Sequence, residues 1–400
     1  MNRTWSIAVL CVAEVLAMST WFSANSVMGV WKQEFALSDA WAAALTSSVS
    51  VGFVLGALVL SLTGTADRVD GRRIFAISAV VCAIANLASL AVPADNGGSL
   101  LLRVIVGASA AGIYPIGMRL ASTWAVSDMG LLVGLLVGAQ VFGLSLPHLV
   151  DAVGGVDWHT TIMVTSLAAA IAALLVSTIS VGPQMATVRS FRAADVRYAW
   201  TNKSIRLANI GYLGHMWELF AMWSWIALFL QDRFDGDAAH PHEQLLAKYV
   251  TFASVAAGAF GCVIGGRIAD RVGRTKTIIA SLFVSGTCAV VLGSFQSMPL
   301  WLVSVLCLVW GFSVVSDSPQ FSAAIVELSP PGIAGTMILA QVAIGFSLTV
   351  VSIQIVPSIL IAWGWAGAFS LLACGPVIGI TATWQLRHRA DARLMGNGQR

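Results

Sequence analysis

Charged side chains are scarce in this sequence of 400 residues. Asp, Glu, Lys and Arg make up only 10% of the chain, whereas an average soluble domain contains about 25%. Hydrophobic residues make up 58%, and the mean hydropathy is +0.83. A soluble protein could not cover its surface with so few charges. The composition therefore excludes soluble domains and indicates an integral membrane protein.

Sequence patterns of catalysis and cofactor binding are also missing. The six cysteines lie inside apolar stretches and form no CxxC pair, which excludes a disulfide framework or a cysteine metal site. There is no phosphate-binding loop, nucleophile elbow or HExxH motif. The net charge of +3 is too small to indicate nucleic-acid binding. We therefore expect no enzymatic activity, no cofactor, no metal and no nucleic-acid partner.

What the sequence does contain is a series of long apolar runs. Twelve runs approach the length of about 20 residues that a membrane-spanning helix needs. They fall at 6–30, 41–63, 74–93, 99–121, 129–150, 160–182, 204–231, 245–268, 275–297, 300–323, 333–357 and 361–385. Lipid offers no partner for free backbone groups, so runs of this length must be helices.

The basic residues predict the orientation of these helices. With the N-terminus in the cytoplasm, 18 of the 22 Lys and Arg residues fall at cytoplasmic ends and loops. The opposite side holds only Lys32, Arg233 and Lys248, and Arg103 lies within a span. Cytoplasmic loops are enriched in Lys and Arg. The sequence therefore predicts twelve transmembrane helices with both termini in the cytoplasm.

The longest polar segment divides the chain into two sets of six spans. It follows the sixth run and carries four basic residues. The sequence predicts an N-terminal six-helix bundle at 1–182, a cytoplasmic linker at 183–203, a C-terminal six-helix bundle at 204–385 and a cytoplasmic tail at 386–400.

The two sets repeat one another. Four residues of the first run recur in the seventh run at an offset of 204: Glu14, Ala17, Met18 and Trp21 correspond to Glu218, Ala221, Met222 and Trp225. Gly107 and Pro115 of the fourth run recur as Gly311 and Pro319 at the same offset. Two parallel repeats are one architecture of secondary transporters, in which the solute site lies between the halves near the membrane midplane.

The loop between the eighth and ninth runs carries the most specific motif. It reads Gly-Arg-Ile-Ala-Asp-Arg-Val-Gly-Arg over 266–274. This pattern resembles the G-x-x-x-D-R-x-G-R signature of the major facilitator superfamily, and the resemblance covers nearly the whole chain. It implies that this loop governs the conformational cycle, through the residues Gly266, Asp270, Arg271, Gly273 and Arg274.

The corresponding loop of the first half departs from the signature. It contains Asp67, Arg68, Gly71 and Arg72, with one extra residue between Arg68 and Gly71. In the family this loop is thought to latch one conformation by contacting the eleventh span. Either Asp67 or Asp70 could make that contact here.

Other family motifs narrow the function only in part. Arg103 and Gly107 resemble the R-x-x-x-G signature of proton-coupled members. The fifth run lacks the G-P-x-x-G-G motif of drug–proton antiporters, which weakens an assignment as a multidrug exporter. Nitrate-type and sugar-porter signatures are also missing, so the sequence identifies no subfamily.

Ionisable residues inside membrane spans are costly and therefore mark candidate functional positions. In this superfamily the first, fourth, seventh and tenth spans line the central cavity, and the notable membrane charges fall on those spans. We predict a substrate and proton-coupling cavity formed by Glu14, Trp21, Arg103, Tyr114, His215, Glu218, Trp225 and Asp317. Each glutamate precedes a Trp by seven residues, which would place carboxylate and indole on one helix face. We expect both glutamates to face the cavity and at least one carboxylate to carry the coupling proton.

The resulting hypothesis is a secondary active transporter for a small organic solute, coupled to protons and working by alternating access. A proton-antiport exporter of drugs or metabolites is the alternative to an importer. An intramembrane enzyme and a transporter-like sensor are two further classes, but no nucleophile accompanies His215 and Glu218, and no sizeable extra cytoplasmic domain is present. The expected partners are the solute, protons and the lipid bilayer. The expected form is a monomer in the bacterial inner membrane.

Overall fold

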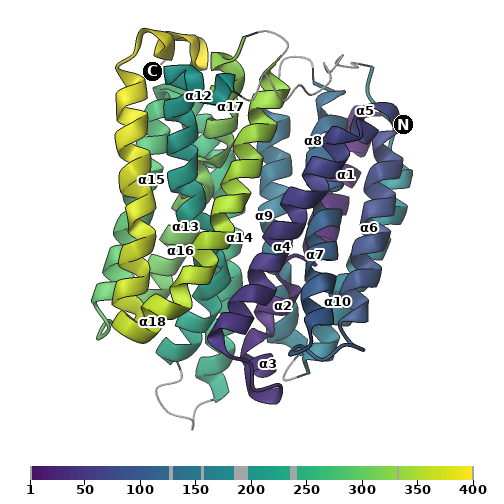
Figure 1. Ribbon diagram of the computed structural model, residues 1–400, viewed down its shortest axis with the longest axis vertical. Helices are drawn as coiled ribbons and strands as arrows, with labels where there is room; N and C mark the ends of the chain where they lie inside the picture. Colours follow the sequence, from purple (N-terminus) through teal and green to yellow (C-terminus); the bar gives the residue numbers. More distant parts are fainter. Residues whose placement is uncertain are drawn as a thin grey trace.

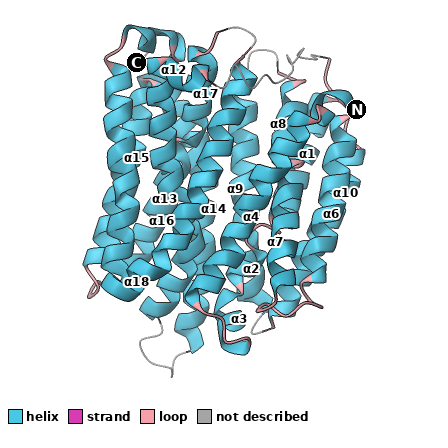
Figure 2. Cartoon of the chain, viewed as in Figure 1, coloured by secondary structure: helices cyan, strands magenta, loops and turns pink. Residues whose placement is uncertain are grey.

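The computed structural model describes residues 2–125, 129–154, 157–183, 197–234, 241–330 and 333–398, without the side chains of residues 66, 67, 129–131, 241, 242 and 397. Every regular element in these ranges is a helix, and short loops join the helices (Figure 2). The first part of the chain forms α1 (Arg3–Met18), α2 (Ser23–Ser26), α3 (Met28–Glu34), α4 (Asp39–Leu62), α5 (Thr65–Arg68), α6 (Gly71–Ala88), α7 (Gly97–Ala111), α8 (Tyr114–Ser122), α9 (Met129–Gly154) and α10 (Trp158–Ser177). The second part forms α12 (Tyr198–Thr201), α13 (Lys203–Phe234), α14 (Pro241–Val272), α15 (Arg274–Ser294), α16 (Leu300–Ser316), α17 (Ser318–Leu328), α18 (Ala334–Arg387), η1 (Ala390–Leu394) and η2 (Gly396–Gly398).

Ten helices in the described ranges are long and apolar enough to cross a membrane. This number differs from the twelve predicted runs for two structural reasons. Helix α1 has only 16 residues because the chain turns after Met18, so the run predicted at 6–30 is not one helix. The two final runs are merged in α18, which has 54 residues.

Helix α18 is broken at Gly364. This glycine has φ 62° and ψ −165°, a conformation with positive φ that favours glycine because other residues would strain the backbone. An unbroken helix of 54 residues would extend about 80 Å at 1.5 Å per residue, far more than a bilayer. The chain instead reverses direction near Gly364, so that 334–363 and 365–387 run in opposite directions and meet at the end of the molecule where α18 is labelled (Figure 1).

The fourth membrane segment of each repeat is broken at the same place. Helices α7 and α8 are separated at Gly112 and Ile113, and α16 and α17 are separated at Asp317. Each second piece carries a proline in its first turn, Pro115 or Pro319. Proline lacks a backbone N–H and cannot continue a regular helix from the preceding turn. The matched breaks agree with the repeat that the sequence indicates.

The two parts of the chain lie side by side, with α4 to α10 on one side and α13 to α18 on the other (Figure 1). Two helix pairs carry most of the contact between them, α9 with α14 and α4 with α18. Both termini lie at the same end of the molecule, which we call the terminal end, and the opposite end is the far end (Figure 1).

The C-terminal segment is folded against the terminal end. Ala392 and Met395 are fully buried, and they pack in a cluster with residues of α13 and α17. Ser204 Oγ donates to Asp391 Oδ2 at 2.5 Å and accepts from Arg389 Nε at 2.8 Å. The described part of the segment predicted as the tail, 386–400, is thus docked against the helices. Most of the predicted linker at 183–203 lies outside the described residues.

Candidate substrate cavity

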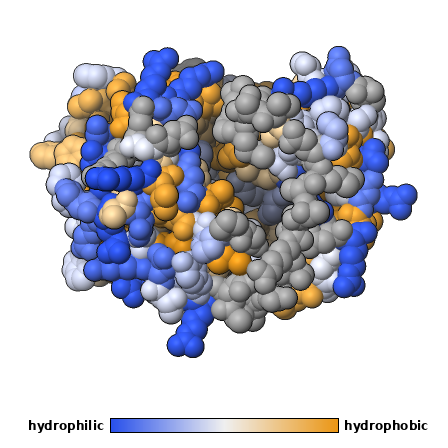
Figure 3. All heavy atoms as spheres, turned by 90° about the horizontal axis from the view of Figure 1, so that it is seen from above, coloured by the Kyte–Doolittle hydropathy of each residue, from blue (hydrophilic) through white to orange (hydrophobic). Residues whose placement is uncertain are grey.

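A large cavity of about 930 Å³ lies between the two parts of the chain. Helices α4, α8 and α9 line one side, and α14, α17 and α18 line the other. The end view shows a hollow between the two parts, with apolar surface inside and hydrophilic residues on the rim (Figure 3). Arg267 and Asp270, near the end of α14, belong to the lining, so the cavity reaches the terminal end. Its volume is typical of a small-molecule site.

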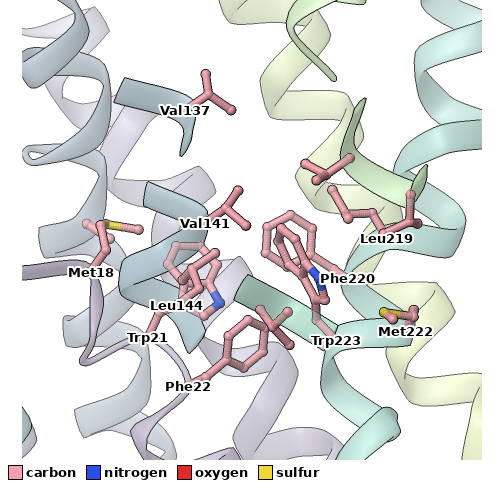
Figure 4. Packing of buried hydrophobic residues seen from close by; sticks show 14 of the residues in the cluster. Met18, Trp21, Phe22, Val137, Val141, Leu144, Leu219, Phe220, Met222 and Trp223 are labelled. Carbon is pink, nitrogen blue, oxygen red and sulfur yellow. The ribbon is translucent and has the colours of Figure 1, made fainter. Parts of the chain in front are cut away.

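Aromatic rings close the inner end of this cavity. Phe53 lines the cavity, and its ring centroid lies 4.3 Å from Phe346 and 5.6 Å from Trp21. Phe220 packs against the same two rings, at 4.9 Å from Phe346 and 5.7 Å from Trp21. Trp21 and Phe22 face Phe220 and Trp223 across the boundary between the two parts (Figure 4). We call Trp21, Phe53, Phe220 and Phe346 the aromatic plug.

Two polar contacts join the two parts beyond the plug, in the half of the molecule toward the far end. Lys248 Nζ of α14 lies 2.8 Å from Asp151 Oδ2 of α9, and Asp151 is almost completely buried. Gln354 Nε2 of α18 donates to Ser47 Oγ of α4 at 2.7 Å. These contacts occur in the same two helix pairs that connect the parts, so both pairs are tied together on this side.

The two glutamates do not line the described cavity, contrary to the prediction. Glu218 is fully buried, and its carboxylate accepts hydrogen bonds from Trp310 Nε1 and Ser285 Oγ, both at 2.8 Å. Glu14 is also fully buried and lies so close to Gly117 of α8 that a Cβ there would collide with Glu14 Oε2. Each carboxylate therefore points into its own part of the molecule.

Glu14 and Trp21 do not share one helix face, because α1 ends at Met18, before the tryptophan. Trp21 lies in a turn after Met18, so it does not extend the helix face that carries Glu14. Trp21 is part of the aromatic plug, whereas Trp225 is not. Trp225 lines a small pocket of about 20 Å³ near the far end, and its Nε1 donates to Ile353 O at 3.3 Å.

Arg103 is buried without a carboxylate among its described partners. Its guanidinium donates to Ser23 Oγ at 3.1 Å, Asn86 Oδ1 at 2.9 Å and Ser89 Oγ at 2.8 Å. The side chain is 1% exposed. Arg103, which was predicted to line the cavity, is therefore held in a neutral hydrogen-bond network within the first part.

His215 and Asp317 form a buried pair beside the break between α16 and α17. His215 Nδ1 lies 2.9 Å from Asp317 Oδ1, but the angles fall outside hydrogen-bond geometry. His215 Nε2 and Asp317 Oδ2 have no hydrogen-bond partner in the described part of the chain. The ring of Phe321 lies 5.7 Å from that of His215. His215 and Asp317 are thus two residues of the predicted coupling site that the structure brings together as an ion pair.

The signature residues of the second part lie at the mouth of the cavity. Gly273 is the N-cap residue just before α15 and has φ 101°, a conformation that favours glycine. Arg274 donates to both carboxylate oxygens of Glu327, at 2.8 and 2.7 Å, and to Gln320 Oε1 at 2.8 Å. The backbone N–H of Gly396 donates to the same carboxylate at 3.0 Å, so Glu327 joins the signature loop to the docked tail.

Gly266 and Asp270 of the signature also line the cavity, and Asp270 and Arg271 are exposed.

In the first signature loop Asp70 and Arg72 contact one another, and the Arg72 guanidinium also donates to Ile179 O, beyond the end of α10, at 3.0 Å. Asp70 accepts from the backbone N–H of Arg72 at 2.9 Å and pairs with its guanidinium at 2.7 Å. The hydrogen bond from the Arg72 side chain lowers the pKa of Asp70 below its ordinary value. Gly71 packs against Leu120 of α8, and Arg68 is exposed. The side chain of Asp67 lies outside the described residues, so the choice between Asp67 and Asp70 stays open.

Tyr114 is the one residue of the predicted substrate and proton-coupling cavity that lines the described cavity. Sequence reasoning missed Phe53, Phe346, Gln320 and Glu327. The first two are apolar residues in apolar runs and give no distinct signal. Glu327 follows Asp317 at the end of the tenth run, and its charge could have marked it as a partner for the basic loop.

Comparison with known proteins shows the family to which this chain is similar. A sequence model of the major facilitator superfamily matches residues 10–346. The citrate–proton symporter of Klebsiella pneumoniae is 32% identical over 137 residues, which cover 29% of this chain and 30% of that protein. An uncharacterized MFS-type transporter of Bacillus subtilis (strain 168) is 31% identical over 148 residues, which cover 36% of this chain and 34% of that protein. The matches thus span about a third of these relatives.

Solved structures of low sequence identity share the fold. A mutant of the nucleoside transporter NupG superposes with a TM-score of 0.76 at 16% identity, covering 96% of this chain and 100% of that chain. A bacterial homologue of the human lysosomal transporter Spinster, in an inward-facing and unoccupied conformation, gives 0.71 at 13% identity, covering 98% and 97%. With the family match across most of its length and its many apolar helices, this chain is a multi-pass membrane protein that belongs to the major facilitator superfamily of transporters.

Proposed function

We propose that the chain is a secondary transporter that moves a small organic solute by alternating access. The single observation that carries the proposal is the cavity of about 930 Å³ between the two parts, open at the terminal end and closed by the aromatic plug. A solute in this cavity has access to one side only. Rocking of one part against the other would close the mouth and open the far end, as in parallel-repeat transporters.

The proposed topology is twelve spans, with α1 as the first and α18 supplying two. Most of the described basic residues belong to the ends and loops at the terminal end, including Arg68, Arg274 and Arg387, and cytoplasmic loops are enriched in such residues. We therefore place both termini and the cavity mouth in the cytoplasm. The two bundles, 1–182 and 204–385, would be the moving bodies, in a monomer in the bacterial inner membrane.

The proposed driving force is protons. Glu14 has no hydrogen-bond partner on either oxygen in the described part of the chain, and an ionised carboxylate without donors is costly to bury. His215 and Asp317 are a second group of buried ionisable residues whose side-chain atoms lack hydrogen-bond partners in the described part of the chain. The similarity to a citrate–proton symporter supports coupling to protons, although it covers 29% of this chain.

The function is tested in proteoliposomes. Solutes that stabilise the purified protein against heat would be assayed for flux with and without a pH gradient. We expect accumulation above equilibrium that depends on the gradient and disappears with a protonophore. Flux that ignores the gradient would refute proton coupling, and no flux of any stabilising solute would refute transport.

A second prediction concerns the ion pair between Lys248 and Asp151. Replacing Lys248 with Gln leaves the Asp151 carboxylate buried without its partner, which destabilises the closed far end. We expect the population open at the far end to rise about tenfold, equivalent to about 1.4 kcal/mol. Spin labels on Leu101 and Trp301, exposed residues of different parts, would measure the separation at the far end.

The matched control is Lys32→Gln. Lys32 pairs with Asp39 at 2.6 Å, but both residues belong to the first part. Its replacement should leave the label distances unchanged. If Lys248→Gln behaves like Lys32→Gln, the pair between α9 and α14 does not hold the far end closed.

A further inference from the structure

We propose that the cavity selects an amphipathic organic molecule whose apolar body occupies the inner end and whose single polar group lies near Gln320. Small polyanions such as tricarboxylates do not fit this arrangement. The inference rests on the proposed function and names the substrate class of the same cavity.

The inner end of the cavity is apolar. Phe53 and Ala57 of α4 face this end, together with Ala111 of α7 and Val342 of α18. Cys262 also lines it, but its thiol is directed to Val315 O at 3.6 Å. Among the described residues that line this end, Tyr114 is the other one that carries a polar group. Burial of apolar ligand surface against such a wall favours binding, whereas the wall has no group that would stabilise several negative charges.

The charged residues of the lining lie at the mouth, where positive and negative charges largely offset one another. Arg274 is held by both oxygens of Glu327 and by Gln320. Arg267 and Asp270 are one turn apart on α14 and both line the cavity, so their charges offset one another. Arg119 is the third arginine of the lining, one and a half turns from Tyr114 toward the mouth. Recognition of a polyanion needs several convergent cationic donors, and the described lining does not supply such a cluster.

Gln320 is placed to meet the one polar group of the ligand. Its Oε1 accepts from Arg274, and its Nε2 lies 4.0 Å from the position that a Cβ would take at Gly266 on the neighbouring helix α14, on the same side of the cavity. Gly266 has no side chain to cover this donor. A few fixed polar groups on an otherwise apolar wall are typical of sites for organic ligands, and the volume of about 930 Å³ suits a drug-sized molecule.

The test uses the purified protein and four probes. Three share a naphthalene body and differ in the head group: 2-naphthol, 2-naphthoate and 2-naphthyltrimethylammonium. The fourth is citrate. We expect at least one naphthyl probe to raise the melting temperature in a saturable manner, and citrate to have no effect.

Two variants of α4 locate the binding. Leu60 lines the cavity, whereas Leu62 is 71% exposed on the same helix. Leu60→Trp would place a bulky ring in the cavity and should weaken naphthyl binding at least tenfold, whereas Leu62→Trp should leave it unchanged. Citrate binding tighter than every naphthyl probe, no naphthyl binding below about 1 mM, or equal affinity in the two variants would each overturn the proposal.

This result is distinguishable from a failure of the transport proposal, because binding is measured without a gradient or vesicles. Naphthyl binding without flux would refute transport alone. Gradient-driven flux of a polyanion without naphthyl binding would refute the substrate class alone.

Discussion

Replacing Gly107 with Ala is expected to destabilise the protein by about 3 kcal/mol or more, at the upper end of overpacking effects. In an ordinary helix interior the same change would be favourable, because alanine has the higher helix propensity. Here a Cβ on Gly107 would collide with the backbone carbonyl of Val49 on α4. The two backbones are in direct contact, so no flexible side chain can move aside. The measurement is the apparent melting temperature and the monodisperse yield after detergent extraction.

The control is Gly97→Ala on the same helix. Nothing lies within 4 Å of a Cβ at Gly97, so this variant should behave like the parent. Gly311 should repeat the effect of Gly107, because its Cβ would collide with the carbonyl of Ser254 on α14. A parent-like Gly107→Ala variant would show that α4 and α7 are less closely packed than described.

The second large effect is expected from Glu14→Gln. Glutamine keeps the shape of the side chain and removes the group that can bind and release a proton. If Glu14 carries the coupling proton, gradient-driven accumulation should fall at least tenfold, while exchange of solute at equilibrium continues. The measurement compares the two fluxes in the same proteoliposomes.

Glu218→Gln and Asp317→Asn complete this experiment. Glu218 already accepts two hydrogen bonds, and glutamine can retain that from Trp310. Asp317 is paired with His215. If both glutamate variants, singly and together, accumulate solute like the parent with the same pH dependence, neither glutamate is the carrier. Loss of accumulation in Asp317→Asn alone would then assign the proton to that carboxylate.

Much of the fold could be predicted because it depends on local sequence. Apolar runs, the repeat and the signature loop predicted a helical membrane protein of this superfamily, and Pro115 and Pro319 do mark broken helices. The number of separate helices was less predictable. Whether a chain turns after Met18 or breaks only at Gly364 depends on tertiary packing rather than on hydropathy.

The site was harder to predict because side-chain direction depends on neighbouring helices. Glu14 and Glu218 were predicted to face the cavity from a spacing that needs a continuous first helix, whereas both carboxylates are buried within their own parts of the molecule. The partners of Arg103 are neutral residues from two other segments, Ser23 of α2 and Asn86 and Ser89 at the end of α6, and no sequence pattern joins them. Phe53 and Phe346 meet only because α4 and α18 cross between the two parts.

The sharing of Glu327 between Arg274 and the Gly396 backbone makes the C-terminal segment a natural reporter of the signature loop. Any movement that withdraws Arg274 changes the carboxylate that anchors this segment. Leu394 is 62% exposed and lies two residues before the anchor. A spectroscopic label there would follow the opening and closing of the mouth in real time, without altering any side chain that lines the cavity.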